Sequence, residues 1–267
     1  IGHQQRKLIQ QMKTAAIIPA RMDSSRFPGK PMKEIHGMPM IGHIFERSKF
    51  ISNADIICVA TCDQEIFDYI NASGGFAVMT SDKHERATER TAEALTLIEK
   101  NMNLKINLVA MIQGDEPMFS PSDIDSGISQ MKDDMSINIV NLMNKAMDDD
   151  DFHDQNNVKV VTSENGDALY YSREPIPSNW LNLEKYQRYI QTGLMIFKST
   201  YLNKFLKMDP TPLENLESCD MLRVLEHGDS VRMVLSETRS IGVDTPADLE
   251  LAEKLLASDE IMSTYIS

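Results

Sequence analysis

Residues 15–31 read AAIIPARMDSSRFPGKP and begin with a short apolar run, which is typical of a buried strand in a parallel sheet. The run leads into a loop that carries the cations Arg21, Arg26 and Lys30, and residues 40–47 then show an apolar face at helical spacing. A strand, a basic loop and a helix in this order can hold a polyphosphate, because backbone N–H groups, the helix N-terminus and the cations face the same anion. A solvated basic surface loop is the alternative interpretation of this stretch.

The composition favours a globular domain that binds a small ligand. The chain has 267 residues, of which 42% are hydrophobic and 25% are charged, as in ordinary soluble domains. Its formal net charge of −13 argues against a nucleic-acid-binding surface, so we expect the basic loop to hold a small anion. No stretch approaches the roughly 18 consecutive apolar residues that cross a bilayer, so no membrane insertion is expected. Cys58, Cys62 and Cys219 fit a reducing cytoplasm better than a disulfide framework.

From residue 54 onwards, apolar runs alternate with amphipathic segments. Buried strands are expected at 54–61, 76–80 and 107–112, and helices at 64–73, 88–99 and 122–131. This alternation indicates βαβ units, and therefore an α/β fold with a mostly parallel, Rossmann-like sheet flanked by helices. Arg21, Arg26, Lys30 and Asp115 all follow strands, so one crevice at the carboxyl ends of the strands can collect them.

The pattern loosens after about residue 136. The acidic run at 147–151 is most simply a solvated loop, and a metal cluster there is a less favoured alternative. Two antiparallel strands are expected at 158–161 and 168–172, around a turn at 164–167. The remaining expected elements are a strand at 192–197, a helix at 201–207, one helix within 212–228, a strand at 232–235 and a helix at 247–257.

We therefore predict a single nucleotidyltransferase-type domain over 13–260, with a β-rich insertion at 155–200. Residues 1–12 begin without an initiator methionine and lack the apolar core of a signal peptide. They are interpreted as an N-terminal extension or a cloning remnant outside the fold.

Two acidic turns carry the chemistry. Residues 113–117 (QGDEP) follow an apolar strand, and residues 242–246 (GVDTP) precede a helix. Asp115 and Asp244, both facing the basic loop, can jointly hold Mg2+ against a nucleoside triphosphate. Taken singly, an aspartate in such a turn is more often a turn former or a helix cap, but the two turns together with the basic loop favour the metal site.

Collinear motifs over most of the chain resemble the 3-deoxy-manno-octulosonate cytidylyltransferase (CMP-KDO synthetase) family, within the wider sugar nucleotidyltransferases. The matching stretches are 18–21 (IPAR), 26–31 (RFPGKP), 88–90 (TER), 113–117, 157–161 (NVKVV), 168–173 (ALYYSR), 211–214 (TPLE), 222–225 (LRVL) and 242–246. The resemblance implies a reaction of lipopolysaccharide biosynthesis: CTP and a 2-keto-3-deoxy acid sugar give the CMP-sugar and pyrophosphate, with Mg2+ required. It also implies a homodimer, with the β-rich insertion as the interface.

The resemblance also implies roles for individual residues. The catalytic residues would be Arg21, Lys30, Asp115 and Asp244, and the two aspartates would be the metal ligands. The nucleotide would be bound by Pro19, Ala20, Arg21, Ser24, Ser25, Lys30, Thr80, Arg90 and Gln113. The acid acceptor would be bound by Arg86, Gln113, Arg173, Gln191 and Asp220. No histidine shows a partner pattern that marks it as a catalytic base.

The chain departs from the family where the acid sugar would bind. Arg86-Ala87 stands in place of Ser-Gly, Gln191-Thr192-Gly193 in place of His-Leu-Gly, Met195 in place of Tyr, and Asp220-Met221 in place of Glu-Gln. Nucleotidyl transfer is therefore better supported than KDO as the acceptor. Arg86 can pair with an additional anionic group or be a solvated surface arginine, and Arg173 can bind the acceptor carboxylate or form a structural ion pair.

Two other functions stay open. The acceptor can be a different acid, such as 8-amino-KDO, a nonulosonic acid or a phosphonate. A nucleotide-binding protein without turnover is the less favoured alternative, because both aspartates and the lysine are present.

Overall fold

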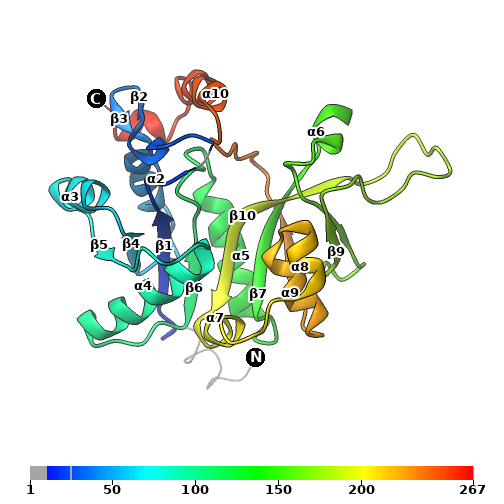
Figure 1. Cartoon of the computed structure of the whole chain (residues 1–267), viewed down its shortest axis with the longest axis horizontal. Helices are drawn as coiled ribbons and strands as arrows, with labels where there is room; N and C mark the ends of the chain where they lie inside the picture. Colours follow the sequence, from blue (N-terminus) through cyan, green and yellow to red (C-terminus); the bar gives the residue numbers. More distant parts are fainter. Residues whose placement is uncertain (1–10, 25, 267) are drawn as a thin grey trace.

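Strand β1 (Thr14–Ala20) lies near the middle of the sheet and is buried along its whole length. The structure is a computed structural model that describes residues 11–24 and 26–266, so Ser25 and nearly all of the predicted N-terminal extension lie outside the described residues. β1 pairs in parallel with β4 (Ile56–Thr61) and β6 (Leu108–Met111), and β4 pairs in parallel with β5 (Ala77–Met79). The predicted parallel βαβ arrangement of this half is confirmed (Figure 1).

The other half of the sheet is of mixed direction. The strand order is β11-β7-β10-β6-β1-β4-β5. β10 (Tyr189–Lys198) runs antiparallel to both of its neighbours, β6 and β7 (Ile139–Lys145), whereas β11 (Arg232–Leu235) runs parallel to β7. β8 (Lys159–Thr162) and β9 (Ala168–Ser172) form the predicted antiparallel pair, and β8 joins them to the sheet through the beginning of β10. The predicted β-rich insertion is thus continuous with the central sheet, because β10 pairs with β8 at its beginning and lies between β6 and β7 at its end.

Helices cover both faces of the sheet and give two hydrophobic cores (Figure 1). One core is covered by α2 (Met40–Ser48), α3 (Gln64–Ala72), α5 (Pro121–Asp133) and α10 (Pro246–Leu256). The other is covered by α4 (Ala87–Met102), α7 (Ser199–Phe205) and α9 (Asp220–Glu226). Side chains of β1 alternate between the two cores, since successive residues of a strand point to opposite faces.

Several elements differ from the sequence-based expectation. The acidic run contains a short helix, α6 (Asp149–His153), because Asp148 caps it by accepting a hydrogen bond from the Asp151 N–H at 2.8 Å. The single helix expected within 212–228 is two helices, α8 (Pro212–Glu217) and α9, because Ser218 between them adopts a left-handed conformation with φ of 49°. A small hairpin, β2 (Glu34–Ile35) and β3 (Met38–Pro39), follows a 3-10 turn, η1 (Lys30–Met32); a second 3-10 turn, η2 (Met262–Thr264), lies near the C-terminus.

The sequence-based expectation also missed β7, although it is a fully integrated strand. Its sequence, INIVNLMNK from 137 to 145, interrupts the apolar run with asparagines, which are depleted in strands. Asn141 is completely buried, and its amide donates to the carbonyls of Leu142, Thr192 and Leu194 at 3.2, 2.9 and 3.2 Å. The last two carbonyls lie where the β7–β10 ladder shifts register between Gln191 and Met195. Asn141 thus satisfies backbone groups that the β-bulge in β10 leaves without ladder partners.

We predict that Asn141→Ala lowers the free energy of unfolding by about 2 kcal/mol or more, because buried carbonyls at the bulge then lose their donor. Urea denaturation measures the change. Asn138→Ala, just before β7, is the matched control. It should cost less than about 1 kcal/mol, since the Asn138 side chain is only half-buried and accepts a single hydrogen bond, from the Lys198 ammonium group. Equal effects of the two substitutions would contradict the role given to Asn141.

Candidate active site

Loops that follow parallel strands meet at one edge of the sheet. β1 and β6 are neighbours in parallel register, so the basic loop after β1 and the QGDEP loop after β6 leave the sheet side by side. Gly114 makes this approach possible, because a Cβ atom at Gly114 would lie 2.6 Å from the carbonyl oxygen of Pro19. The predicted crevice at the carboxyl ends of the strands is therefore present.

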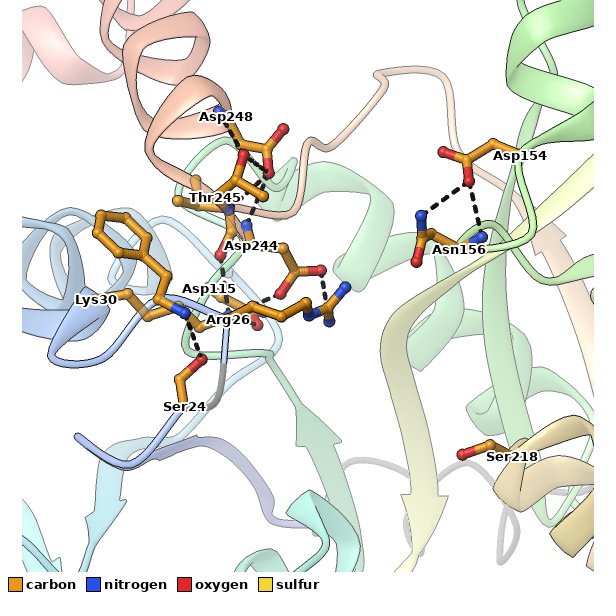
Figure 2. Close-up of polar contacts among 12 residues, drawn as sticks. Ser24, Arg26, Lys30, Asp115, Asp154, Asn156, Ser218, Asp244, Thr245 and Asp248 are labelled. Atoms are coloured by element: carbon orange, nitrogen blue, oxygen red, sulfur yellow. Dashed lines mark hydrogen bonds and ion pairs between the residues drawn. The ribbon is translucent and has the colours of Figure 1, made fainter.

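Lys30 joins the two acidic turns. Its ammonium group lies 2.7 Å from Asp115 Oδ2 and 3.0 Å from Asp244 Oδ1, and it also donates to the carbonyl of Val243 at 2.9 Å (Figure 2). The Val243 N–H donates to the carbonyl of Asp115 at 2.8 Å, which holds the two turns together through the backbone as well. The convergence of Lys30, Asp115 and Asp244 that the sequence predicts is confirmed.

The charges around Lys30 fix its protonation state. Burial by itself would lower the pKa of Lys30, but attraction and hydrogen bonds from Asp115 and Asp244 outweigh burial and raise this pKa. Arg26, which the sequence predicts to share the crevice with Lys30 and Asp115, lies 3.0 Å from Asp244 Oδ2 (Figure 2). Lys30 therefore stays charged at neutral pH, and two cations face the aspartate pair.

A capping box holds Asp244 at the start of α10. Asp248 Oδ2 accepts hydrogen bonds from the backbone N–H groups of Asp244 and Thr245 at 3.0 and 2.8 Å (Figure 2). The Thr245 hydroxyl in turn accepts from the Asp248 N–H. The side chain of Asp244 is thereby placed by a rigid helix terminus.

A basic cavity of about 310 Å3 lies beside Lys30 and contains most of the predicted nucleotide-binding residues. We call it the first cavity; its walls include Pro19, Ala20, Arg21, Ser24, Arg26, Lys30, Arg86, Arg90, Gln113, Asp115 and Asp244. Arg90 is almost completely buried and donates to the Thr80 hydroxyl at 2.6 Å and to the Ser81 carbonyl at 3.1 Å. Thr80 thus lies behind the wall and positions Arg90.

Two predicted acceptor-binding residues are engaged with each other. The Arg86 guanidinium contacts the carboxylate of Asp220 and lies 3.6 Å from Glu214 Oε1. Glu214 is completely buried and also pairs with Arg223 at 2.5 Å. Arg86 is therefore half-buried and held by charged partners beside the first cavity.

Arg173 differs from its predicted role. Its guanidinium donates to the backbone carbonyls of Glu217 and Gln155 at 2.7 and 2.8 Å, and it lines neither the first cavity nor the one described next. The backbone N–H of Arg173 donates to Glu217 Oε2 at 2.8 Å. These contacts tie β9 to α8, so Arg173 has a structural role and its donors are spent on the protein itself.

A second cavity, of about 300 Å3, lies on the other side of the aspartate pair and shares Gln113, Asp115 and Asp244 with the first. Its further walls include Glu116, Asn144, Asn157, Gln191, Gly193, Arg239 and Ser240. The bulge of β10 brings Gly193 here, where its N–H donates to Glu116 Oε1 at 3.1 Å and its carbonyl accepts from Gln113 at 3.2 Å. Of the predicted acceptor-binding residues, Gln113 and Gln191 therefore line the second cavity.

Sequence reasoning missed Glu116 and Arg239. Glu116 is the second acidic residue of the QGDEP motif, so its position next to Asp115 could have marked it as a candidate site residue. The pKa of Glu116 is raised from its ordinary value of 4.5 to about 7, mainly by burial and to a smaller extent by the charges of Asp115 and Asp244, although Ser240 and the Gly193 N–H oppose the shift. Arg239 stands in the connection between β11 and α10, where no motif marks it.

Comparisons with known proteins identify the family of the chain. The family model described as "Cytidylyltransferase" matches residues 15–236. A 3-deoxy-manno-octulosonate cytidylyltransferase of Geobacter metallireducens is 40% identical over 255 residues, which cover 91% of this chain and 98% of that protein. The same enzyme of Thermodesulfovibrio yellowstonii is also 40% identical over 255 residues, which cover 92% of this chain and 98% of the relative.

Solved structures share the fold. A CMP:2-keto-3-deoxy-manno-octonic acid synthetase complexed with CTP superposes with a TM-score of 0.84 at 33% identity, covering 92% of this chain and 98% of that one. A cytidylyltransferase of Leptospira borgpetersenii, at 17% identity and a TM-score of 0.62, shows similarity of fold alone. The α/β nucleotidyltransferase fold predicted from the sequence is confirmed.

The raised pKa of Glu116 predicts a pH-dependent stability. The folded protein keeps the carboxyl protonated up to about pH 7, whereas the unfolded chain ionises it near pH 4.5, so the free energy of unfolding falls between these values. At 1.36 kcal/mol per unit, the whole effect is about 3 kcal/mol. Glu116→Gln should remove it, which makes the variant gain stability relative to wild type as the pH rises from 5 to 8 in urea denaturation without metal.

Glu164→Gln, in the exposed turn between β8 and β9, is the matched control and should follow the wild-type pH profile. If Glu116→Gln also follows that profile, Glu116 ionises normally in the folded protein.

Proposed function

This chain belongs to the cytidylyltransferase family, and from that premise we propose that it transfers CMP from CTP to a hydroxylated 2-keto-3-deoxy acid, releasing pyrophosphate. The observation that supports the proposal most strongly is the Lys30–Asp115–Asp244 cluster at the wall between a basic cavity and a second cavity. A triphosphate and an acceptor placed on either side of that wall meet at the cluster. The relatives that carry the 3-deoxy-manno-octulosonate name make this acid the first acceptor to test.

The first cavity supplies the cations that a triphosphate needs. We assign Arg21, Lys30 and Arg26 to its phosphates, and Arg90 with Gln113 to the rest of the nucleotide or the sugar. Attack of a hydroxyl on the α-phosphorus adds negative charge to phosphate oxygens, and preorganised cations stabilise that charge in the transition state. Holding both reactants at one wall supplies a further part of the rate enhancement. The chain thus acts by positioning and electrostatics, without a covalent intermediate.

The aspartate pair fits Mg2+. Asp115 and Asp244 are half-buried carboxylates that share one ammonium group, and among the described residues no cluster of three or more His, Cys, Asp or Glu side chains forms a closed metal cage. Two protein carboxylates with the remaining positions left to substrate phosphates and water is the coordination that Mg2+ prefers. We therefore propose that Asp115 and Asp244 hold Mg2+, while Lys30 turns toward the phosphates. When bound, this ion neutralises phosphate charge and acidifies a coordinated hydroxyl.

The acceptor is open within the class of hydroxylated acids. The pairing of Arg86 with Asp220 occupies two positions that the family resemblance assigned to the acid sugar. This observation supports an acceptor that differs from KDO. A protein that binds CTP without turnover is the less favoured alternative, because Asp115, Asp244 and Lys30 are in place. We also propose that the reaction takes place in the cytoplasm, where the three free cysteines remain reduced. Among the described residues, no helix is both long enough and apolar enough to span a bilayer.

The assay that tests the function measures pyrophosphate release from CTP and Mg2+ with a panel of acids: 3-deoxy-manno-octulosonate, its 8-amino derivative, a nonulosonic acid and a phosphonate. We expect release with at least one acid, and none after chelation of the metal. Tight CTP binding without release from any acid would instead identify a nucleotide-binding protein.

Lys30→Ala should lower kcat/KM for pyrophosphate release by about 10²–10³-fold, because it removes a fixed cation from the phosphates. Lys204→Ala is the matched control: Lys204 pairs with Asp229 at 2.5 Å and lines neither cavity, so its loss should change kcat/KM by less than about threefold. A Lys30→Ala enzyme with wild-type kcat/KM would remove Lys30 from the mechanism.

We propose a homodimer that uses the β-rich region at 155–200. The segment between β9 and β10 projects from the body of the molecule (Figure 1), and Trp180 and Leu181 on it are 87% and 76% exposed. Leu169 on β9 is 62% exposed as well. Such side chains gather at interfaces more often than on free surfaces.

Light scattering is expected to give twice the mass of the chain for the wild type and the single-chain mass for Trp180→Asp, because a charge at an interface core opposes association. A single-chain mass for the wild type would contradict the dimer.

A further inference from the structure

Buried polar atoms without hydrogen-bond partners concentrate in the second cavity. Within residues 11–24 and 26–266, such side-chain atoms are Thr14 Oγ1, Glu116 Oε2, Asn141 Oδ1, Asn144 Oδ1, Thr211 Oγ1, Arg239 Nη1 and Ser240 Oγ. Four of them, on Glu116, Asn144, Arg239 and Ser240, belong to walls of the second cavity. An unpaired buried polar atom costs about 1–3 kcal/mol. A set of four in one cavity therefore indicates a surface shaped for a polar ligand.

Arg239 is braced by Asp151, which lines the second cavity beside it. Its Nη2 lies 2.8 Å from Asp151 Oδ1, and the Asp151 side chain is only 7% exposed. Asn157 donates to the same oxygen at 2.9 Å, and the Met147 N–H donates to the other carboxylate oxygen at 2.9 Å. Arg239 thus has its charge matched and its position fixed, while Nη1 keeps a donor without a partner.

The unpartnered set contains both donors and acceptors. Arg239 Nη1 only donates, Asn144 Oδ1 only accepts, and the Ser240 hydroxyl can do either. The side chains of Ser240 and Glu116 interact, but neither Ser240 Oγ nor Glu116 Oε2 has a hydrogen-bond partner of normal geometry. A ligand hydroxyl both donates and accepts, so a chain of hydroxyls matches this wall better than an anion does. The charge of Arg239 is already matched by Asp151. Lys145 also lines the cavity, but the carboxylates of Asp115, Asp151 and Asp244 on the same walls disfavour an anion there.

The position of the cavity connects this wall to the reacting groups. Asp115, Asp244 and Gln113 line both cavities, so a molecule in the second cavity reaches the same aspartates as a triphosphate in the first. The reacting hydroxyl of an acceptor would lie at that shared wall, and the rest of the acceptor would extend toward Arg239 and Asn144.

We propose that Arg239, Asn144 and Ser240 bind the hydroxylated chain of the acceptor, remote from its reacting end, and so select acceptors by the length and hydroxylation of that chain. This proposal rests on the proposed cytidylyltransferase function. It places acceptor selection on β7 and on the connection from β11 to α10. Arg173 and Asp220 have no such part, because Arg173 spends its donors on backbone carbonyls and Asp220 is paired with Arg86.

The test compares Arg239→Ala and Asn144→Ala with wild type in the pyrophosphate-release assay, using 3-deoxy-manno-octulosonate or whichever acid of the panel the wild type accepts. We expect KM for the acid to rise about 10–100-fold for Arg239→Ala and about 3–10-fold for Asn144→Ala. KM for CTP should stay within about threefold, because the first cavity does not contain these residues. Thermal melting checks that each variant is folded at the assay temperature.

Arg232→Ala is the matched control. Arg232 pairs with Asp167 at 2.7 Å, as Arg239 does with Asp151, but it lines neither cavity. Its loss should leave both KM values unchanged. If Arg239→Ala and Asn144→Ala also keep the wild-type KM for the acid, these residues do not bind the acceptor and the proposal is wrong.

A shortened acid tests which end of the acceptor Arg239 binds. Calorimetric titration of a six-carbon 2-keto-3-deoxy acid, in the presence of an unreactive CTP analogue, should give the same affinity for wild type and Arg239→Ala. Binding to wild type that is too weak to detect supports the proposal equally, because this acid lacks the outer hydroxyls. If Arg239→Ala lowers the affinity for the six-carbon acid as much as it lowers the affinity for the full-length acid, Arg239 binds the carboxylate end, which overturns the proposal.

The two proposals can fail separately. A wild-type protein that releases no pyrophosphate with any acid contradicts the proposed function. Release by the wild type together with unchanged Arg239→Ala and Asn144→Ala variants contradicts only the assignment of the second cavity.

Discussion

The ammonium group of Lys30 is the interaction on which the site depends. It contacts carboxylates in two turns, Asp115 and Asp244, which lie 85 and 214 positions after Lys30 in the sequence. The carboxylates of Asp115 and Asp244 are half-buried and contact the same ammonium group, so without Lys30 their negative charges would repel each other. The loop after β1, the loop after β6 and the start of α10 are therefore held in one arrangement before any substrate binds. Preorganisation of this kind is what makes fixed charges effective in catalysis.

The same cluster divides the active site into two environments. The first cavity is lined by five cations and four carboxylates within a protein whose net charge is −13, so the cations are concentrated locally and can face a small polyanion. The second cavity has its arginine neutralised by Asp151 and offers hydrogen-bonding atoms of both kinds. Under our proposals, contacts in the second cavity distinguish related acceptors, whereas the transfer of CMP from CTP depends on residues of the first cavity.

An irregular strand connects the fold to this second environment. The bulge in β10 leaves carbonyls that Asn141 satisfies from β7, and it places Gly193 against Gln113 and Glu116. A side chain at Gly193 would collide with both of these residues, so the position requires glycine for lack of space. Bulges often re-aim backbone groups next to active sites, and here the bulge supplies one N–H and one carbonyl to the wall of the second cavity.

The sequence alone determined the order of strands and helices in the parallel half of the sheet, the basic loop after the first strand, and the two turns that carry Asp115 and Asp244. These features have local causes: apolar periodicity, turn residues and helix caps act within a few positions of the chain. Only the tertiary structure decided the features that depend on distant partners. β7 is a strand because Asn141 finds buried acceptors across the sheet, Arg173 is held by the carbonyls of Glu217 in α8 and of Gln155, and Glu116 has a raised pKa because several segments exclude water from it. Burial and the completion of hydrogen bonds are set by residues far apart in the sequence, so no local pattern encodes them.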